Sequence, residues 1–134
     1  TKINLVVAID TSGSTRSLLH RFISELSALM KEFSQIQLCL IECDSNITQV
    51  RNFSESYQLD QALKLGFTGG GGTEFNPVFD YVKQHDLQPD CLVFFTDGYG
   101  MAPQLAPHYP VLWLLVGGDQ QPSSWGSTVV MDTQ

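Results

Sequence analysis

The feature that most constrains the fold is a nearly continuous apolar run at the start of the chain, which ends abruptly in polar residues. Residues 3–9 are apolar apart from Asn4, and Asp10, Ser12 and Ser14 then follow at alternate positions. A parallel strand that is buried on both faces shows this pattern, because helices cover both sides of its sheet. Ligands of open α/β sheets bind at the carboxyl ends of the strands. The sequence therefore predicts a binding site directly after the first strand.

Further apolar segments alternate with segments of helical periodicity. The expected strands cover 36–43, 47–53, 91–96, 111–116 and 128–131, and the expected helices cover 15–33, 55–65 and 76–85, the last of them capped by Asn76 and begun by Pro77. Within the first helix, apolar side chains recur at helical spacing as far as Leu29 and Phe33 and make one apolar face.

The link between strands 36–43 and 47–53 is so short that only a hairpin can join them, and this pair should be antiparallel. The alternation elsewhere predicts parallel strands with helices on both faces. We therefore expect an α/β fold, a doubly wound Rossmann-like three-layer sandwich. Its mostly parallel central sheet should have the strand order 3-2-1-4-5-6, with one antiparallel edge strand.

This strand order decides which polar residues meet. The first and fourth strands are neighbours in it, so Asp97, after the strand 91–96, should lie beside Asp10 and the two serines. The glycine run 69–72, which precedes Thr73, allows its loop to approach them closely. Carboxylate and hydroxyl oxygens are hard donors that suit Mg²⁺. Each signal alone also fits an ordinary turn or helix cap, but their convergence on one crevice favours a metal site.

Composition limits the remaining classes of function. A chain of 134 residues is long enough for one domain only, so 1–134 is expected to be a single domain. The net charge of −7 argues against a nucleic-acid partner, and no apolar run approaches the roughly 20 residues that span a membrane. The odd number of cysteines, 3, argues against a disulfide framework and favours the cytoplasm. Strand-like sequence begins almost at residue 1, which indicates a domain taken from a longer chain.

The candidate residues resemble a known pattern. The segments 10–14 (Asp-Thr-Ser-Gly-Ser), 69–73 (Gly-Gly-Gly-Gly-Thr) and 96–98 (Thr-Asp-Gly) are similar to the metal-ion-dependent adhesion site (MIDAS) of von Willebrand factor A (VWA) domains. The resemblance implies Mg²⁺, with Mn²⁺ or Ca²⁺ as alternatives, and a coordination position left open for a carboxylate of a partner. The implied metal ligands are the hydroxyls of Ser12, Ser14 and Thr73, and the carboxylates of Asp10 and Asp97, bound directly or through water.

Longer strings resemble a narrower group. Residues 69–79, 96–100 and 110–113 are similar to bacterial VWA-like domains at the C-terminal end of predicted metallopeptidases, which are often linked to AAA+ ATPases of the MoxR type. The resemblance implies that this chain is the C-terminal part of a longer one and that such an ATPase is a candidate partner. The chain is also short after Val116, so the helix usual between the fifth and sixth strands of VWA domains should be missing or reduced.

Three functions compete for these residues. The leading interpretation is a protein-binding module without catalytic residues, which recognises an Asp or Glu of a protein partner through the metal. The alternative is a Mg²⁺-dependent hydrolase of the phosphatase type with Asp10 as nucleophile, although Ser12 stands where the usual second acid would be. A peptidase site is not evident, because the chain lacks His-Glu-x-x-His, so peptidase activity would lie in a missing N-terminal region and this domain would be accessory to it. A scaffold with an empty site is the third interpretation.

Overall fold

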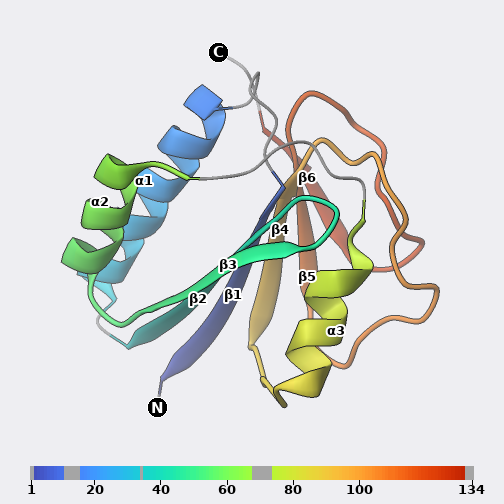
Figure 1. Ribbon diagram of the computed structural model, residues 1–134, viewed down its shortest axis with the longest axis horizontal. Helices are drawn as coiled ribbons and strands as arrows, with labels where there is room; N and C mark the ends of the chain where they lie inside the picture. The colour runs from blue at the N-terminus through green and yellow to red at the C-terminus, as the bar shows by residue number, and fades with distance from the viewer. Residues whose placement is uncertain (1, 11–15, 34, 68–73, 132–134) are drawn as a thin grey trace.

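The computed structural model describes residues 2–10, 16–33, 35–67 and 74–131, with the side chain of Arg16 left out. A single six-stranded sheet lies between two layers of helices (Figure 1). Its strands are β1 (Ile3–Asp10), β2 (Ile36–Cys43), β3 (Ile47–Phe53), β4 (Cys91–Thr96), β5 (Val111–Leu115) and β6 (Ser127–Val130). Helices α1 (Arg16–Glu32) and α2 (Ser56–Leu65) cover one face, and α3 (Asn76–Gln84) covers the other.

The strand order is β3-β2-β1-β4-β5-β6, which confirms the predicted order. Strand β1 pairs in parallel with both β2 and β4, and β4–β5 and β5–β6 are parallel as well. The β2–β3 hairpin is antiparallel, as its short link required, and its register shifts at Glu42/Cys43. The fold is therefore the doubly wound α/β sandwich that the alternation of elements predicted.

Burial on both faces explains why β1 and β4 are largely apolar. Alternate side chains of β1 enter two different cores, with Val7 and Ile9 facing α1 and α2, and Val6 and Ala8 facing α3. The core on the α3 face is built largely from aromatic rings, which include Phe75, Phe79, Phe94, Trp113 and Trp125. The two central strands are thereby fixed from both sides, which gives their carboxyl ends a rigid base.

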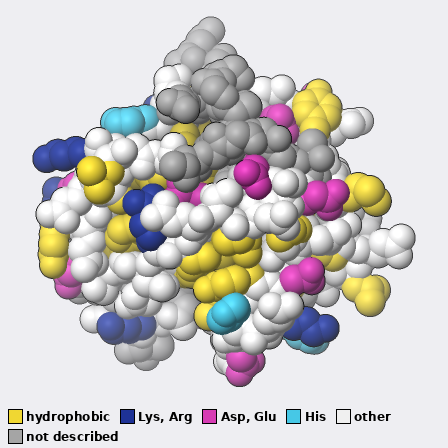
Figure 2. Space-filling model, viewed as in Figure 1, with side chains coloured by type: hydrophobic (Ala, Val, Ile, Leu, Met, Phe, Trp, Pro, Cys, Tyr) yellow, Lys and Arg dark blue, Asp and Glu magenta, His cyan; other side chains and the backbone are white. Residues whose placement is uncertain are grey.

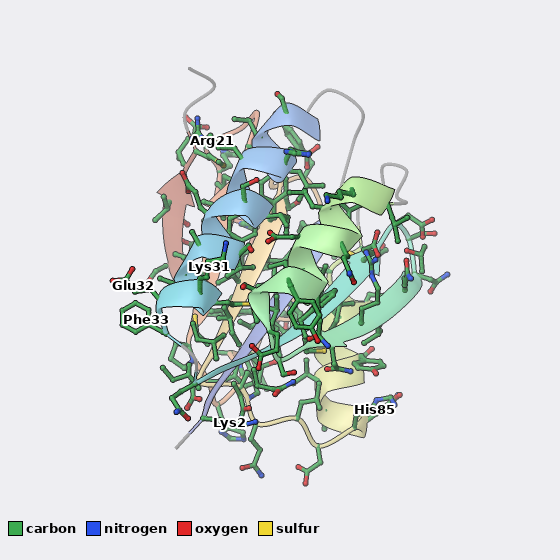
Figure 3. All side chains as sticks on the ribbon, turned by 90° about the vertical axis from the view of Figure 1, so that its left-hand side faces the viewer. Lys2, Arg21, Lys31, Glu32, Phe33 and His85 are labelled. Carbon is green, nitrogen blue, oxygen red and sulfur yellow. The ribbon has the colours of Figure 1, made fainter. Side chains whose placement is uncertain are left out.

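Helix α1 packs through a narrower face than its periodicity predicted. Leu18, Ile23 and Met30 are buried, whereas Leu29 is 42% and Phe33 51% exposed. Helix α1 ends at Glu32, and Figure 3 shows Phe33 at this end of the helix, projecting sideways beyond it. The predicted apolar face is therefore buried only in part, because the apolar stripe of this helix is wider than the part that contacts the sheet.

Two local details bear on the expected helices. Helix α3 has Phe75 as its N-cap, so Asn76 is its first residue rather than its cap, and Pro77 lies in the first turn. Between β5 and β6, residues 116–126 contain no helix, as the short chain predicted. Instead, the indole of Trp113 donates a hydrogen bond to Ser123 Oγ (3.0 Å), and Ser123 Oγ donates to the carbonyl of Trp125 (2.6 Å).

The three cysteines, Cys39, Cys43 and Cys91, are free, so the expectation of no disulfide framework is confirmed. Of the helices that the structure describes, none combines the length and the apolar character that crossing a membrane requires.

Candidate metal centre

Asp10 and Thr96 meet at the carboxyl ends of the two central strands. Strands β1 and β4 pair in register up to Ile9 and Phe95, so the next residue of each lies at the same edge of the sheet. Thr96 is fully buried and Asp10 is 7% exposed. The hydroxyl of Thr96 donates a hydrogen bond to Asp10 Oδ2 (3.1 Å). A buried carboxylate is stable only when such donors or positive charge compensate it, so Thr96 both orients and stabilises Asp10.

Asp97 follows in a turn that several contacts make rigid. Its Oδ1 accepts a hydrogen bond from the backbone N–H of Tyr99 (3.0 Å), and the N–H of Gly98 donates to the hydroxyl of Thr96 (3.2 Å). Gly98 has φ +90°, a conformation that other residues rarely adopt. The neighbouring loop lies so close that a Cβ atom on Gly118 would be 2.5 Å from the carbonyl oxygen of Asp97. The half-buried Asp97 side chain is therefore held at the same edge as Asp10.

Ser12, Ser14 and Thr73, the three predicted hydroxyl ligands, lie outside the described residues, but the residues next to Thr73 are informative. Glu74 forms an isolated parallel bridge with Met101, in the loop after Asp97. Glu74, the residue after Thr73, therefore pairs with the loop that follows Asp97, one of the two predicted carboxylate ligands. The position of the Thr73 hydroxyl itself stays a prediction.

An ion pair between the partly exposed Arg51 and the buried Glu42 lies next to Phe67. Glu42 is 1% exposed and accepts a hydrogen bond from Arg51 Nη2 (2.9 Å). The Arg51 guanidinium also lies over the ring of Phe67, 5.4 Å from its centre. Phe67 is the last described residue before the glycine run, and this stacking contact holds it beside Arg51.

Cys43 is a neighbour of the site that the sequence analysis did not place there. It ends β2 directly opposite Asp10, and its thiol donates to the carbonyl oxygen of Ile9 (3.4 Å). Burial, and after it the negative charges of Asp10 and Asp44, raises the pKa of the Cys43 thiol to about 12. The thiol therefore stays neutral at pH 7. In the sequence, only the position of Cys43 at the end of an apolar strand could have indicated that it lies beside the site.

The donor set fits a hard cation better than a soft one. Asp10 and Asp97 provide carboxylate oxygens, whereas Cys43 is a neutral thiol already directed to a backbone carbonyl. Among the described residues, no group of three or more His, Cys, Asp or Glu side chains is placed to hold a metal ion. A site at this edge would accordingly need hydroxyl ligands besides the two carboxylates, and such an all-oxygen set is one that Mg²⁺ accepts.

The fold and this edge define a class: a doubly wound α/β domain with acidic residues at the carboxyl ends of its two central strands. Residues 5–132 match the family of VWA-like domains (DUF2201), and the chain belongs to this family. The predicted VWA-like fold is thereby confirmed. The match covers nearly the whole chain but assigns no metal and no partner to it.

A solved structure gives the same result for the fold alone. The three N-terminal domains of the type V pili tip protein Mfa5 from Porphyromonas gingivalis are similar to this chain with a TM-score of 0.51 and 14% sequence identity. The similarity covers 74% of this chain and 20% of that chain, so the domain spans about a fifth of the length of the Mfa5 structure. The search of curated proteins finds no match.

Proposed function

We propose that this domain is a metal-dependent protein-binding module, which recognises an acidic side chain of a protein partner through a Mg²⁺ ion at a MIDAS. The observation that most supports the proposal is the placement of Asp10 and Asp97 at the carboxyl ends of the adjacent strands β1 and β4, with Asp10 oriented by the buried hydroxyl of Thr96. The VWA-like fold adds to it, because domains of this fold are associated with protein interaction.

In this proposal, Asp10 and Asp97 face the ion directly or through water, and Ser12, Ser14 and Thr73 add neutral hydroxyl oxygens. The ion, when bound, would supply positive charge that an incoming carboxylate can bind. Only two carboxylates offset the charge of a dication, so the site keeps affinity for a third. Thr96 keeps one oxygen of Asp10 engaged and thereby limits how that carboxylate can turn.

The chain itself is proposed to bind and not to catalyse. Asp97 is held by a backbone N–H of its own turn, which suits a fixed ligand. A phosphatase assay with a generic phosphomonoester and Mg²⁺ tests this part of the proposal. Turnover that disappears in Asp10→Asn would show that the domain is an enzyme instead.

Calorimetry with Mg²⁺ and with Mn²⁺ tests the metal site. We expect one site per chain, and the double variant Ser12→Ala/Ser14→Ala should bind at least tenfold more weakly because two of the proposed ligands are gone. Ser24→Ala is the matched control, since Ser24 is an exposed serine of α1. The metal proposal fails if the folded wild type shows no binding of either ion. It also fails if Ser12→Ala/Ser14→Ala binds the ion as tightly as the wild type and the Ser24→Ala control do.

The partner proposal needs its own experiment. An AAA+ ATPase of the MoxR type is the first partner to test, because the resemblance of residues 69–79 and 96–100 points to it. Binding should vanish in EDTA, and an amide in place of the partner's recognised Asp or Glu should have the same effect. Affinity that EDTA leaves unchanged would place the binding surface elsewhere on the domain.

A further inference from the structure

A second surface lies at the opposite end of the sheet from the candidate metal centre. A groove of about 1000 Å³ is lined by residues of α3 and of the segment 103–110. This segment leads to the start of β5 (Figure 1). Asp90 and Pro110, which line the groove, directly precede β4 and β5. Because β4 contains 6 residues, about 20 Å separate the groove from the metal edge. The two surfaces can therefore act independently.

The wall formed by residues 103–110 is fixed at both ends. The indole N–H of Trp125 donates a hydrogen bond to the carbonyl of Pro103 (2.9 Å), and the backbone N–H of Leu92 donates to the carbonyl of Pro110 (2.9 Å). Pro107 lies between them, and each proline has a restricted φ. A wall with so little freedom loses little entropy when something binds against it.

The groove has an apolar floor and an apolar lip. Phe79 and Val82 of α3 are buried beneath it, and Tyr109 is half-buried, with a pKa raised to about 12 by its burial. Leu105, on the wall, is 85% exposed. A leucine so exposed on a rigid wall beside buried aromatic rings offers apolar contact to a partner side chain that enters the groove.

The rim of the groove is acidic. Asp80 and Asp86 are exposed, and among the described residues neither forms an ion pair, while Asp90 already accepts a hydrogen bond from the backbone N–H of Asn4 (2.7 Å). Lys83, which also lines the groove, is the one lysine or arginine in residues 74–134, so acidic side chains outnumber it at the rim. The acidic residues of this part of the chain are Glu74, Asp80, Asp86, Asp90, Asp97, Asp119 and Asp132.

The net charge of −7 therefore divides into −6 for residues 74–134 and −1 for residues 1–73. Figure 2 shows the difference, since Asp and Glu predominate over Lys and Arg on the right-hand side of that face, where α3 and the loops beside it lie. Arg21 and Lys31 lie on α1, on the other side of the sheet (Figure 3). The groove thus combines an apolar floor with a rim that attracts positive charge.

We propose that this groove is a docking site for a segment of a protein partner in which an apolar side chain is flanked by lysine or arginine. The apolar side chain lies on Phe79 and Val82 beneath Leu105. The basic side chains lie opposite Asp80 and Asp86. A second copy of the domain does not match this surface, because its own charge is −7.

The test is selection of random dodecapeptides displayed on phage, carried out on the wild-type domain in EDTA so that the metal proposal plays no part. The selected peptides should share an apolar residue with Lys or Arg close to it. A synthetic peptide of the consensus sequence should then bind Asp80→Asn/Asp86→Asn about 5- to 30-fold more weakly than the wild type, and Leu105→Ser about tenfold more weakly.

The matched control is Glu25→Gln/Glu32→Gln, which removes the same amount of charge from exposed positions of α1. This control should bind the peptide within twofold of the wild type, and amide chemical shifts of the labelled wild-type domain should change within 79–90 and 103–110. The proposal is overturned if no peptide is enriched or if the enriched peptides lack Lys and Arg. It is also overturned if both double variants lose affinity equally, or if the domain associates with itself through this groove.

Discussion

Replacing Asp97 with asparagine separates the hydrogen bond that its side chain accepts in the turn from the metal-ligand role proposed for it. The amide oxygen of the substituted side chain can still accept the hydrogen bond from the N–H of Tyr99, but the negative charge beside Asp10 is lost. In EDTA we therefore expect the variant to be as stable as the wild type or slightly more stable, because like charges at neighbouring strand ends repel. Asp97→Ala loses the hydrogen bond as well and should be about 1 kcal/mol less stable than Asp97→Asn.

With metal the order should reverse. A free Mg²⁺ concentration ten times the dissociation constant stabilises the wild type by about 1.4 kcal/mol, which for a domain of this size raises the melting temperature by roughly 4–6 °C. If the loss of one carboxylate lowers the affinity tenfold, the same Mg²⁺ concentration stabilises Asp97→Asn by only about 0.4 kcal/mol. The melting shift should then fall to roughly 1–2 °C.

Thermal melts followed by circular dichroism, in EDTA and in Mg²⁺, measure both quantities for each variant. Glu25→Gln is the control, since it removes one negative charge from an exposed position of α1 and should keep the full Mg²⁺ shift. A full shift in Asp97→Asn would refute the reasoning, because Asp97 would then be a residue of the turn and not a ligand.

The remaining predictions concern the surroundings of the site. Thr96→Val should cost about 1–3 kcal/mol in urea unfolding and weaken Mg²⁺ binding 10- to 100-fold, because Asp10 loses a buried donor. Thr96→Ser keeps the hydroxyl and should keep the Mg²⁺ affinity, although the loss of its buried methyl group costs about 1 kcal/mol. Equal Mg²⁺ affinities of the two variants would show that the hydroxyl is unimportant. Gly118→Ala should destabilise by about 1–3 kcal/mol, because its Cβ would lie 2.5 Å from the carbonyl oxygen of Asp97, and an unchanged urea midpoint would contradict the close approach. Because the pKa of the Cys43 thiol is raised in the folded protein, the thiol ionises first in the unfolded chain as the pH rises above 9.0. Ionisation of the unfolded chain lowers the free energy of unfolding, so the contribution of the neutral thiol to stability is lost between pH 9.0 and about pH 12. Between pH 8 and pH 10 the wild type should lose about 1.4 kcal/mol more than Cys43→Ala in urea unfolding, and equal losses would show that the thiol ionises as readily in the fold.

The strand order could be predicted because it depends on patterns within single elements. Strands β1 and β4 are apolar on both faces, so they had to be central, and the short link between β2 and β3 left only a hairpin. The place of Asp10 and Asp97 at one edge of the sheet followed from that order.

The details of the site could not be predicted in the same way. The hydrogen bond between Thr96 and Asp10 joins residues 86 positions apart, and the contact of Gly118 with Asp97 depends on how two loops pack. Threonine at the end of an apolar strand has several ordinary uses, so nothing in its own segment indicates that its hydroxyl supports a carboxylate. The exposure of Phe33 escaped prediction for a related reason, since periodicity defines an apolar stripe but not how much of it the sheet can cover.

The central position of β1 also has a consequence for how the chain folds during synthesis. Strand β2, its first partner, follows after a single helix, so β1 to α2 can assemble early as one unit. The other edge of β1 waits for β4, whose residues come 86 positions later, as the pair Asp10 and Thr96 shows. At roughly 5–20 residues per second, this interval lasts about 4 to 17 s. During this time β1 has one unpaired, apolar edge in the nascent chain. Chaperones bind such surfaces, and without chaperones an unpaired strand edge can pair with another chain and aggregate.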